Sequence, residues 1–386
     1  MTTMLEYSLE LERWCNSNLM PENLLANHTT ARVGGPATTW VVASTEEQLI
    51  TAIADTDTAK TPLLVLAGGS NMLVADEGFP GTVVRIATNG IEIMESTPAD
   101  VHVRIAAGQH WDAVVEWSVA KGLSGIEALS GIPGSTGATP VQNVGAYGSD
   151  ISQTLLSIRA WDRHAHRIVE FGANELEFGY RDSVIKRTIV SSAEDFFNAS
   201  PRWIVLSVDL RLAKTGQTAP VRYAQLAKAL NVELGATASL EHIRQTVLGL
   251  RASKGMVLDT ADYDTWSTGS FFTNPIVPAA VADTLPENAP RFAHAEANGI
   301  GEAVKLSAAW LIDQAGYHKG FGLNGEPDTT GRAGLSTKHT LALTNRGDAT
   351  AKDLINIATL VRDGVERCWG ISLVPEPVLV GVQLGV

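Results

Sequence analysis

The run from Gly131 to Gly148, GIPGSTGATPVQNVGAYG, constrains the fold of this chain more than any other segment. It holds five glycines and two prolines in eighteen residues, so it cannot form an ordinary helix or strand. Loops longer than about 12 residues are uncommon unless they are functional or disordered. The run is apolar between its glycines, which argues against a solvated linker. We therefore expect a binding loop that points N–H groups at an anion; the alternative is a structural loop that packs its own side chains.

A shorter run, Gly68-Gly69-Ser70-Asn71, follows an apolar strand predicted at Leu63–Ala67. Its N–H groups can form a small concave site for an anion. The alternative is a tight turn with Asn71 in a left-handed conformation. The run is neither a Walker loop nor a G-x-G-x-x-G fingerprint, which argues against those two nucleotide folds. Two anion-binding loops in one half of the chain suit a ligand that carries a diphosphate.

The composition indicates a folded protein that acts on small molecules. Apolar residues make up 45% of the 386 residues and charged residues 18%, which supports hydrophobic cores and two or three domains. The net charge is -13 and no long basic run occurs, so nucleic acid is not an expected partner. An acidic total still allows a locally positive pocket for a small anion.

Several features favour a cytoplasmic protein without a metal. Met1–Asn16 lacks the segments of a signal peptide, and no uncharged apolar stretch reaches the roughly 18 residues of a membrane span. Cys15 and Cys368 are expected to be buried or inert thiols in a reducing compartment. The nine histidines are scattered. Their one close pair, His164 and His166, lacks a metal-binding pattern, so no metal site is predicted.

Hydrophobic periodicity predicts mixed helices and strands. A capping box over Ser44–Glu47 starts a helix between two strands, which gives a β-α-β unit. Strands are expected at 39–43, 63–67, 82–86, 91–94, 101–106 and 377–382. Spacing does not reveal which domain the last of these strands joins.

The second half of the chain changes character. Leu206–Leu212 alternates apolar and polar residues, as in a half-buried strand. The turn-rich segment Lys214–Pro220 marks a domain boundary. Beyond it, an apolar helical stripe is opened by Thr350, runs to Cys368 and is closed by Gly370.

Four further side chains suit ligand chemistry, and each has a structural alternative. Arg181 offers a planar guanidinium that matches a carboxylate, or a surface ion pair with Asp182 or another nearby acid. Ser270 precedes two phenylalanines outside any serine-hydrolase elbow, and it is alternatively a serine at a strand edge. Glu376 lies between two prolines that fix its backbone, or it is a solvated acid in a terminal turn. Lys254 offers a point charge to a phosphate, or lies on a solvated helix face.

Together these runs resemble the UDP-N-acetylenolpyruvoylglucosamine reductase family, also called the MurB family. The likeness is nearly chain-long, from about Asn27 to Val382, and chance does not reasonably explain seven segments in order. The matching segments are Asn27–Gly35, Gly68–Val74, Gly131–Gly148, Tyr180–Lys186, Gly269–Pro275, Ala309–Gly316 and Pro375–Glu376.

The resemblance implies an α+β fold. Two lobes form a FAD-binding domain of the PCMH or vanillyl-alcohol-oxidase type, and a separate α+β domain binds the substrate. The expected bounds are 1–86 for the first lobe, joined by a C-terminal strand in 371–386, then 87–214 for the second lobe and 215–370 for the substrate domain. We expect a cytoplasmic monomer that acts on small molecules, with neither nucleic acid nor a membrane as a partner.

The resemblance also implies the cofactors and the reaction. NADPH reduces a bound FAD, and the reduced flavin passes hydride to the enolpyruvyl group of UDP-N-acetylglucosamine enolpyruvate. The product is UDP-N-acetylmuramate, a precursor of peptidoglycan. The residues that match cofactor contacts are Gly68, Gly69, Ser70, Asn71, Met72, Pro133, Gly134, Ser135, Gly137 and Ala138.

Three catalytic residues match the family. Arg181 matches the arginine that meets the enolate-like charge left by hydride addition, and Glu376 matches the glutamate beside it. Ser270 matches the proton donor. The substrate-binding matches are Tyr147, Tyr180, Tyr223, Lys254, Asn274 and His339.

The chain departs from the family pattern in two ways. His339 stands where we expect a glutamine that helps to hold the uridine, although an imidazole can also donate or accept a hydrogen bond. The segments 187–211 and 254–270 are longer than the pattern, which affects the alignment of Tyr223 and Lys254.

Two other functions remain open at this point. One is a different FAD oxidoreductase, such as an oxidase of a sugar or lactone, which would need no proton donor paired with an enolate-stabilising cation. The other is a nucleotide-sugar binding or regulatory protein with a dead site, which would carry no flavin. The combination of Arg181, Ser270 and Glu376 argues against both.

Overall fold

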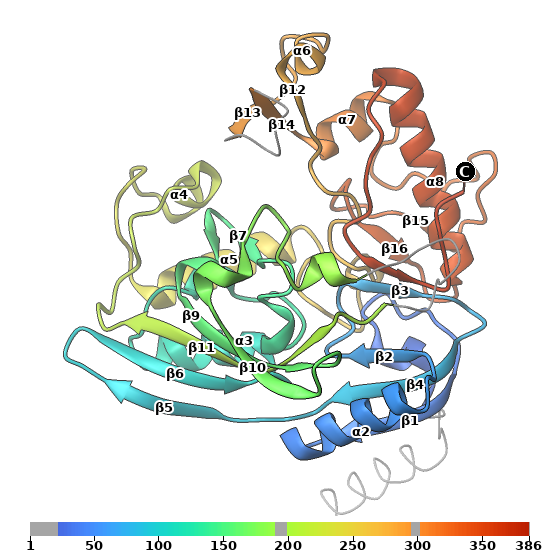
Figure 1. The fold of residues 1–386 in the computed structure, drawn as a ribbon. Coiled ribbons are helices and arrows are strands. Elements are labelled where there is room, and N and C mark those ends of the chain that lie inside the picture. The colour runs from blue at the N-terminus through green and yellow to red at the C-terminus, as the bar shows by residue number, and fades with distance from the viewer. Residues whose placement is uncertain (1–21, 190–198, 295–301, 386) are drawn as a thin grey trace, which may run out of the picture.

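The computed structural model describes residues 22–189, 199–294 and 302–385. The chain forms three parts in Figure 1: a first lobe (blue), a second lobe on a larger sheet (cyan to green) and a C-terminal part (orange to red). The expectations for Met1–Asn16 and Cys15 lie outside the described residues. No helix in the described ranges is long and apolar enough to cross a membrane.

The first lobe contains the predicted β-α-β unit. β1 (Ala37–Ala43), α2 (Glu46–Thr58) and β2 (Leu63–Leu66) follow one another, and β4 (Phe79–Ile86) pairs in parallel with both strands. The apolar side of α2 packs on this three-stranded sheet. The predicted order of strand, helix and strand is therefore confirmed.

The N-terminus of α2 corrects one detail of the prediction. Thr45 is the N-cap, and its side chain accepts a hydrogen bond from the main-chain N–H of Gln48. The Gln48 side chain accepts in return from the N–H of Thr45. The box predicted over Ser44–Glu47 is one residue early. Glutamate and glutamine both fit the last position of a capping box, so the pattern alone does not fix its register.

The strand near the C-terminus joins this lobe. β17 (Val378–Val380) pairs in parallel with β3 (Met72–Val74), and Val380 lies opposite Val74. Both valines are fully buried in one core cluster of the first lobe. This pairing carries Glu376, two residues before the strand, to the loop that precedes β3.

The second lobe is a five-stranded antiparallel sheet with the strand order β10-β9-β11-β6-β5. Its strands are β5 (Ile91–Ser96), β6 (Asp100–Ala106), β9 (Leu155–Asp162), β10 (Arg167–Gly172) and β11 (Trp203–Ala213). α3 (Trp111–Ala120) packs on it, and the glycine-rich run follows α3. That run contains the 3-10 helix η3 (Thr136–Ala138) and β7 (Gly145–Ala146), which pairs with β8 (Ser149–Asp150).

The expectation that 206–212 is half-buried is wrong. β11 is buried along most of its length, and Asp209 is fully buried. The neighbouring strand β6 covers this position with two basic side chains, because His102 and Arg104 both contact the Asp209 carboxylate. Alternation predicts a polar face, but it does not show that a partner strand will cover that face with opposite charge.

Two helices follow β11 and contact the second lobe. α5 (Leu240–Ala252) lies beside α3, and α4 (Ala224–Leu230) packs on α5. Arg244 of α5 binds both carboxylate oxygens of Asp112 in α3, at 2.7 and 2.9 Å. We propose three domains: 1–86 with 371–386, 87–214 and 215–370.

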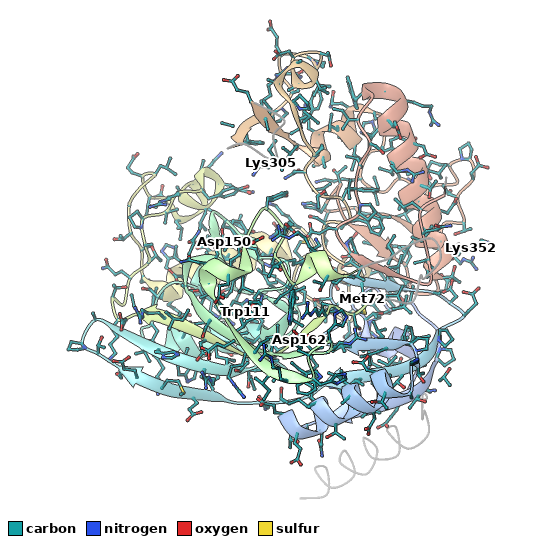
Figure 2. All side chains as sticks on the ribbon, viewed as in Figure 1. Met72, Trp111, Asp150, Asp162, Lys305 and Lys352 are labelled. Carbon is teal, nitrogen blue, oxygen red and sulfur yellow. The ribbon has the colours of Figure 1, made fainter. Side chains whose placement is uncertain are left out.

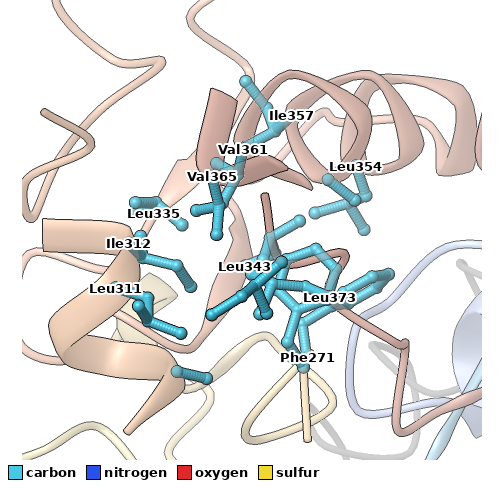
Figure 3. Packing of buried hydrophobic residues seen from close by; sticks show 14 of the residues in the cluster. Phe271, Leu311, Ile312, Leu335, Leu343, Leu354, Ile357, Val361, Val365 and Leu373 are labelled. Atoms are coloured by element: carbon cyan, nitrogen blue, oxygen red, sulfur yellow. The ribbon is translucent and has the colours of Figure 1, made fainter. Parts of the chain in front are cut away.

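The C-terminal part combines short strands with two longer helices. Its elements are β12 (Ile276–Pro278), α6 (Ala279–Ala282), β13 (Arg291–His294), β14 (Ala303–Leu306), α7 (Ala308–Gln314), β15 (Ala333–Leu335), β16 (Leu343–Asn345) and α8 (Ala351–Trp369). Figure 3 shows core residues of α7, Leu311 and Ile312, facing those of α8, with Phe271 and Leu373 packed below α8.

α8 matches its predicted ends but not all of its predicted burial. Thr350 caps the helix, and Gly370 ends it in a left-handed conformation. Leu354, Val361 and other stripe residues are buried, whereas Cys368 is exposed. In the last turn of α8 it is Trp369, and not Cys368, that packs against the core.

Candidate active site

A central cavity lies where the two lobes and the C-terminal part meet. Figure 2 labels two residues that line it, Met72 and Trp111, on either side of the middle of the molecule. Most of the predicted cofactor and catalytic residues line this same cavity: Gly68, Gly69, Ser70, Asn71, Met72, Pro133, Ser135, Gly137, Ala138, Arg181, Ser270 and Glu376. Segments distant in sequence thus converge on one site.

The two glycine runs form one wall because they touch. A Cβ atom added to Gly68 would lie 2.6 Å from the Cα atom of Gly134, so only hydrogen fits there. Ser70 Oγ donates to the carbonyl oxygen of Pro133 at 3.0 Å. The left-handed residue of the first run is Gly69, with φ +58°, and not Asn71 as the tight-turn alternative supposed.

Gly68→Ala is expected to weaken FAD binding. The added methyl group would meet main-chain atoms of Gly134, which cannot rotate away as a side chain can. Such overpacking costs about 1–3 kcal/mol, which corresponds to about thirtyfold in affinity at its midpoint. Flavin content after purification and titration of the apoprotein with FAD measure the effect. Gly249→Ala is the control, because a Cβ atom there meets open space; equal FAD affinity in both variants would contradict the prediction.

The start of α3 fixes the second glycine run. The main-chain N–H of Trp111 donates to the Gly134 carbonyl at 3.0 Å. Asp112 accepts from the Gly131 N–H at 2.6 Å while it binds Arg244. Burial raises the pKa of the Asp112 carboxyl, but Arg244 and the Gly131 N–H outweigh this and hold that pKa below its usual value.

Buried polar atoms without a partner show what the cavity can bind. Among the described residues, Ser135 Oγ, Arg181 Nε and Arg251 Nε are buried without a hydrogen-bond partner, and all three residues line this cavity. Such groups are costly unless a ligand satisfies them. The hydroxyl and the two guanidinium groups therefore fit a ligand that carries phosphate and carbonyl oxygens.

Arg181 and Glu376 form an ion pair inside the cavity. Arg181 Nε lies 3.2 Å from Glu376 Oε1 but does not direct its N–H at it, so this proton stays available to a ligand. A terminal nitrogen of Arg181 donates to the Gly145 carbonyl at 2.9 Å. Asp182 instead contacts Arg187, at 3.4 Å. The alternative of a surface pair between Arg181 and Asp182 is therefore wrong.

Glu376 is held rigidly and shielded from water. Its side chain is 12% exposed, and its main-chain N–H donates to the Phe271 carbonyl at 2.8 Å. Burial raises the pKa of the Glu376 carboxyl, and Arg181 and Lys186 oppose that rise. A solvated acid in a terminal turn, the alternative considered above, does not describe this residue.

Ser270 reaches the cavity from the C-terminal part. It forms an isolated bridge with Ala342, while Phe271 and Phe272 behind it are buried in the core. Ser270 therefore does lie at a strand edge, as the structural alternative supposed. Ser270 also lines the same cavity as Arg181 and Glu376.

The predicted substrate residues lie outside the lining of the central cavity. Tyr180 and Asn274 line an adjoining cavity together with Arg181. Tyr147 and Tyr223 meet edge to face, with ring centroids 5.7 Å apart. Lys254 Nζ lies 3.2 Å from the side-chain oxygen of Gln225, in the first turn of α4. Tyr147 itself belongs to the glycine-rich run Gly131–Gly148.

His339 is a neutral side chain in this structure. Its Nδ1 accepts from the Leu341 N–H at 3.1 Å, so it acts as an acceptor. Burial, and then the charges of Lys254, Lys319 and Arg251, lower the pKa of His339 from 6.5 to about 4. An uncharged acceptor is what a glutamine at this position would also provide.

His339→Gln is expected to flatten the acid side of the stability profile. A pKa depressed from 6.5 to about 4 means that the wild-type fold is favoured above pH 6.5 and loses this contribution as the pH falls toward about 4. Glutamine does not titrate, so the loss disappears. Denaturant unfolding of both proteins from pH 7 to 4 measures it. Parallel profiles would contradict the shift, and His318→Gln, an exposed site, is the control.

The sequence assigned no role to two cations of the cavity. Lys186 ends the matching segment Tyr180–Lys186, and Arg251 lies in the last turn of α5, three residues before Lys254. Both line the cavity. Burial lowers the pKa of Arg251 to about 10, which still leaves it charged at neutral pH. The sequence signal available for Lys186 was its position as a basic residue inside a segment that matches the family.

Two family models match the sequence. The model of a FAD binding domain matches residues 36–171, and that of the C-terminal domain of UDP-N-acetylenolpyruvoylglucosamine reductase matches residues 261–380. Reductases of this name from Saccharopolyspora erythraea and Thermobifida fusca are each 48% identical to the chain. The matches cover 93% of this chain and 95% and 97% of the relatives. The chain belongs to the UDP-N-acetylenolpyruvoylglucosamine reductase family.

A solved structure of the family supports the same fold. The crystal structure of the reductase MurB from Thermus caldophilus is 25% identical and superposes with a TM-score of 0.59. The match covers 92% of this chain and 97% of that one. The predicted α+β class, with its FAD-binding domain, is therefore confirmed.

Proposed function

We propose that this chain is a flavoprotein oxidoreductase that uses NADPH to reduce UDP-N-acetylglucosamine enolpyruvate to UDP-N-acetylmuramate, a step of peptidoglycan precursor synthesis. Full-length identity of 48% to reductases of this name supports the reaction. The observation that carries the proposal for this chain is the convergence of Arg181, Ser270 and Glu376 on one cavity beside the glycine runs.

The cavity has the groups that FAD requires. The residues proposed to hold it are Gly68 to Met72, Pro133, Gly134, Ser135, Gly137 and Ala138. The hydroxyl of Ser135 and the Nε–H of Arg251 have no partner and can bind oxygens. Arg251 extends the predicted set. Bound FAD supplies the hydride that originates from NADPH.

Arg181 is proposed to stabilise the charge that the reaction creates. Hydride adds to the terminal vinyl carbon, and negative charge spreads from the next carbon into the carboxylate. A guanidinium in a water-poor site meets this charge most effectively. The free Nε–H of Arg181 is already directed away from Glu376, so the protein does not have to break a hydrogen bond to provide it.

Ser270 and Glu376 are proposed to complete the reaction. The charged carbon needs a proton, and Ser270, which carries a hydroxyl, lines the same cavity. Serine is a weak acid, so the nearby positive charges must make the transfer feasible. Glu376, with its pKa raised by burial, can share a proton with the substrate carboxyl group and hold it in its acid form.

The remaining assignments concern binding and setting. We propose that Tyr180 and Asn274 contact the sugar nucleotide near Arg181, and that Tyr147, Tyr223, Lys254 and His339 contact its diphosphate and uridine. We also propose a cytoplasmic monomer that acts on small molecules and binds neither nucleic acid nor a membrane. The net charge of -13, without a long basic run, supports the last point.

An anaerobic absorption experiment tests the function. NADPH should bleach the flavin band of the purified protein, and the enolpyruvyl sugar nucleotide should then restore it. A colourless protein would favour the binding protein with a dead site. A flavin that NADPH bleaches and only oxygen restores would favour a different oxidoreductase, such as an oxidase.

A further inference from the structure

Lys186 lies beside two of the proposed catalytic residues without a role of its own so far. It begins the 3-10 helix η6 (Lys186–Thr188), and its side chain turns back along the chain. Its Nζ donates to the main-chain oxygen of Arg181 at 2.8 Å, and the residue lines the central cavity. The turn between the two is tied to the glycine-rich run, because Ser183 Oγ donates to the Val141 carbonyl at 2.5 Å.

The contact matters because Arg181 has an unusual backbone. Its φ is +55°, a left-handed conformation that side-chain-bearing residues rarely adopt. Such a conformation persists only when its surroundings hold it, and it is common at functional sites. The paired residues Gly179 and Asp182 close the turn, and Lys186 binds the carbonyl oxygen inside it. The direction of the Arg181 side chain depends on this turn.

Lys186 also shares the electrostatic environment of Glu376. The groups that face the Glu376 carboxyl are Arg181, Lys186 and, more weakly, the hydroxyl of Tyr180. The groups that face the Lys186 ammonium are Glu376, Asp182 and Arg181. Burial lowers the pKa of Lys186, and the two carboxylates oppose that shift. A single buried acid therefore has two cations next to it.

We propose that Lys186 is a positioning residue for reduction of the enolpyruvyl group. Its ammonium fixes the main chain of Arg181 and adds a second positive charge beside Glu376. The inference rests on the proposed function. It is not required for reduction of the flavin, because that step creates no charge at the Arg181 and Glu376 pair.

The test compares Lys186→Met with Lys186→Arg by anaerobic stopped-flow measurement of each half-reaction. The Met variant is expected to keep flavin reduction by NADPH and to slow reoxidation by the enolpyruvyl sugar nucleotide about 10²-fold, as misplacement of a catalytic group by about 1 Å does. The Arg variant keeps the charge but not the length, so it should recover part of the rate. Flavin content and thermal unfolding report whether each variant folds.

Lys214→Met is the matched control. Its ammonium also donates to a main-chain oxygen, that of Thr97 at 2.6 Å, but it is exposed and does not line the cavity. Both half-reactions should be unchanged in this variant. If Lys186 acted only as a structural tie, Lys186→Met and Lys214→Met would have the same effect on the two half-reactions.

The pH profile of reoxidation provides the readout that a purely structural role would not move. Lys186 lowers the pKa of Glu376, so its removal raises that pKa and moves the corresponding limb to higher pH in the Met variant. The limb should stay in place in the Arg variant and vanish in Glu376→Gln. An unmoved limb in Lys186→Met, or equal losses in both half-reactions, would overturn the proposal. Failure of the wild type to reoxidise would instead overturn the proposed function.

Discussion

Ser270→Ala should leave reduction of the flavin by NADPH intact and slow reduction of the enolpyruvyl group by about 10²-fold or more. The hydroxyl is the proposed proton source for the carbon next to the carboxylate, and the hydride-accepting step of the flavin needs no such proton donor. The substitution removes one oxygen atom at a strand edge, with Phe271 and Phe272 still packed behind it. Single-turnover measurements of each half-reaction separate the two effects.

The control for Ser270→Ala is the same substitution at a serine outside the cavity. Ser157 lies on β9, where its hydroxyl donates to Glu170 at the surface, so Ser157→Ala should behave as the wild type in both half-reactions. Equal losses in the two half-reactions of Ser270→Ala would remove Ser270 from the proton-donor role. Unchanged flavin content would show that the loss is chemical rather than structural.

Arg181→Met should slow reoxidation of the flavin by the substrate about 10²–10³-fold, the usual effect of removing one group that stabilises developing negative charge. The same change leaves Glu376 without its ion-pair partner at 3.2 Å, so the pKa of this buried acid rises further. The limb of the pH profile that reports Glu376 therefore moves to higher pH. Rapid mixing of reduced enzyme with substrate across pH values measures both effects.

Arg187→Met is the matched control for this prediction. Arg187 lies six residues further along the chain, is 45% exposed and pairs with Glu177 and Asp182 outside the cavity. Its loss should affect neither half-reaction. Arg181→Met and Glu376→Gln should be strongly non-additive, because the two side chains contact each other. Independent effects in the double variant would contradict a shared role.

Local features of the fold could be predicted where a single segment carries its own signal. The helix between Thr350 and Gly370 has a cap at each end, and the glycine-rich run excludes regular structure by composition alone. The predicted start of α2 was wrong by one residue, because Ser44 and Thr45 both fit the capping-box pattern. Burial of Asp209 could not be predicted, because it depends on the charges of a strand that lies far away in the sequence.

The candidate site could be assembled only in part from the sequence. The resemblance named Arg181, Ser270 and Glu376 together, whereas their spacing alone left each with a structural alternative. No pattern indicated that Lys186 folds back onto Arg181, because that contact depends on one positive φ angle. The low pKa of His339 likewise depends on burial and on three cations from two separate segments.

The parallel pairing of β17 with β3 has a consequence for synthesis on the ribosome. The strand that delivers Glu376 emerges after both lobes, although it completes the first of them. Chains fold from the N-terminus as they are made, and pairings between distant segments form late. A nascent chain can therefore form the two glycine runs proposed to bind the flavin before Glu376 is in place. Turnover begins only when the whole structure has closed.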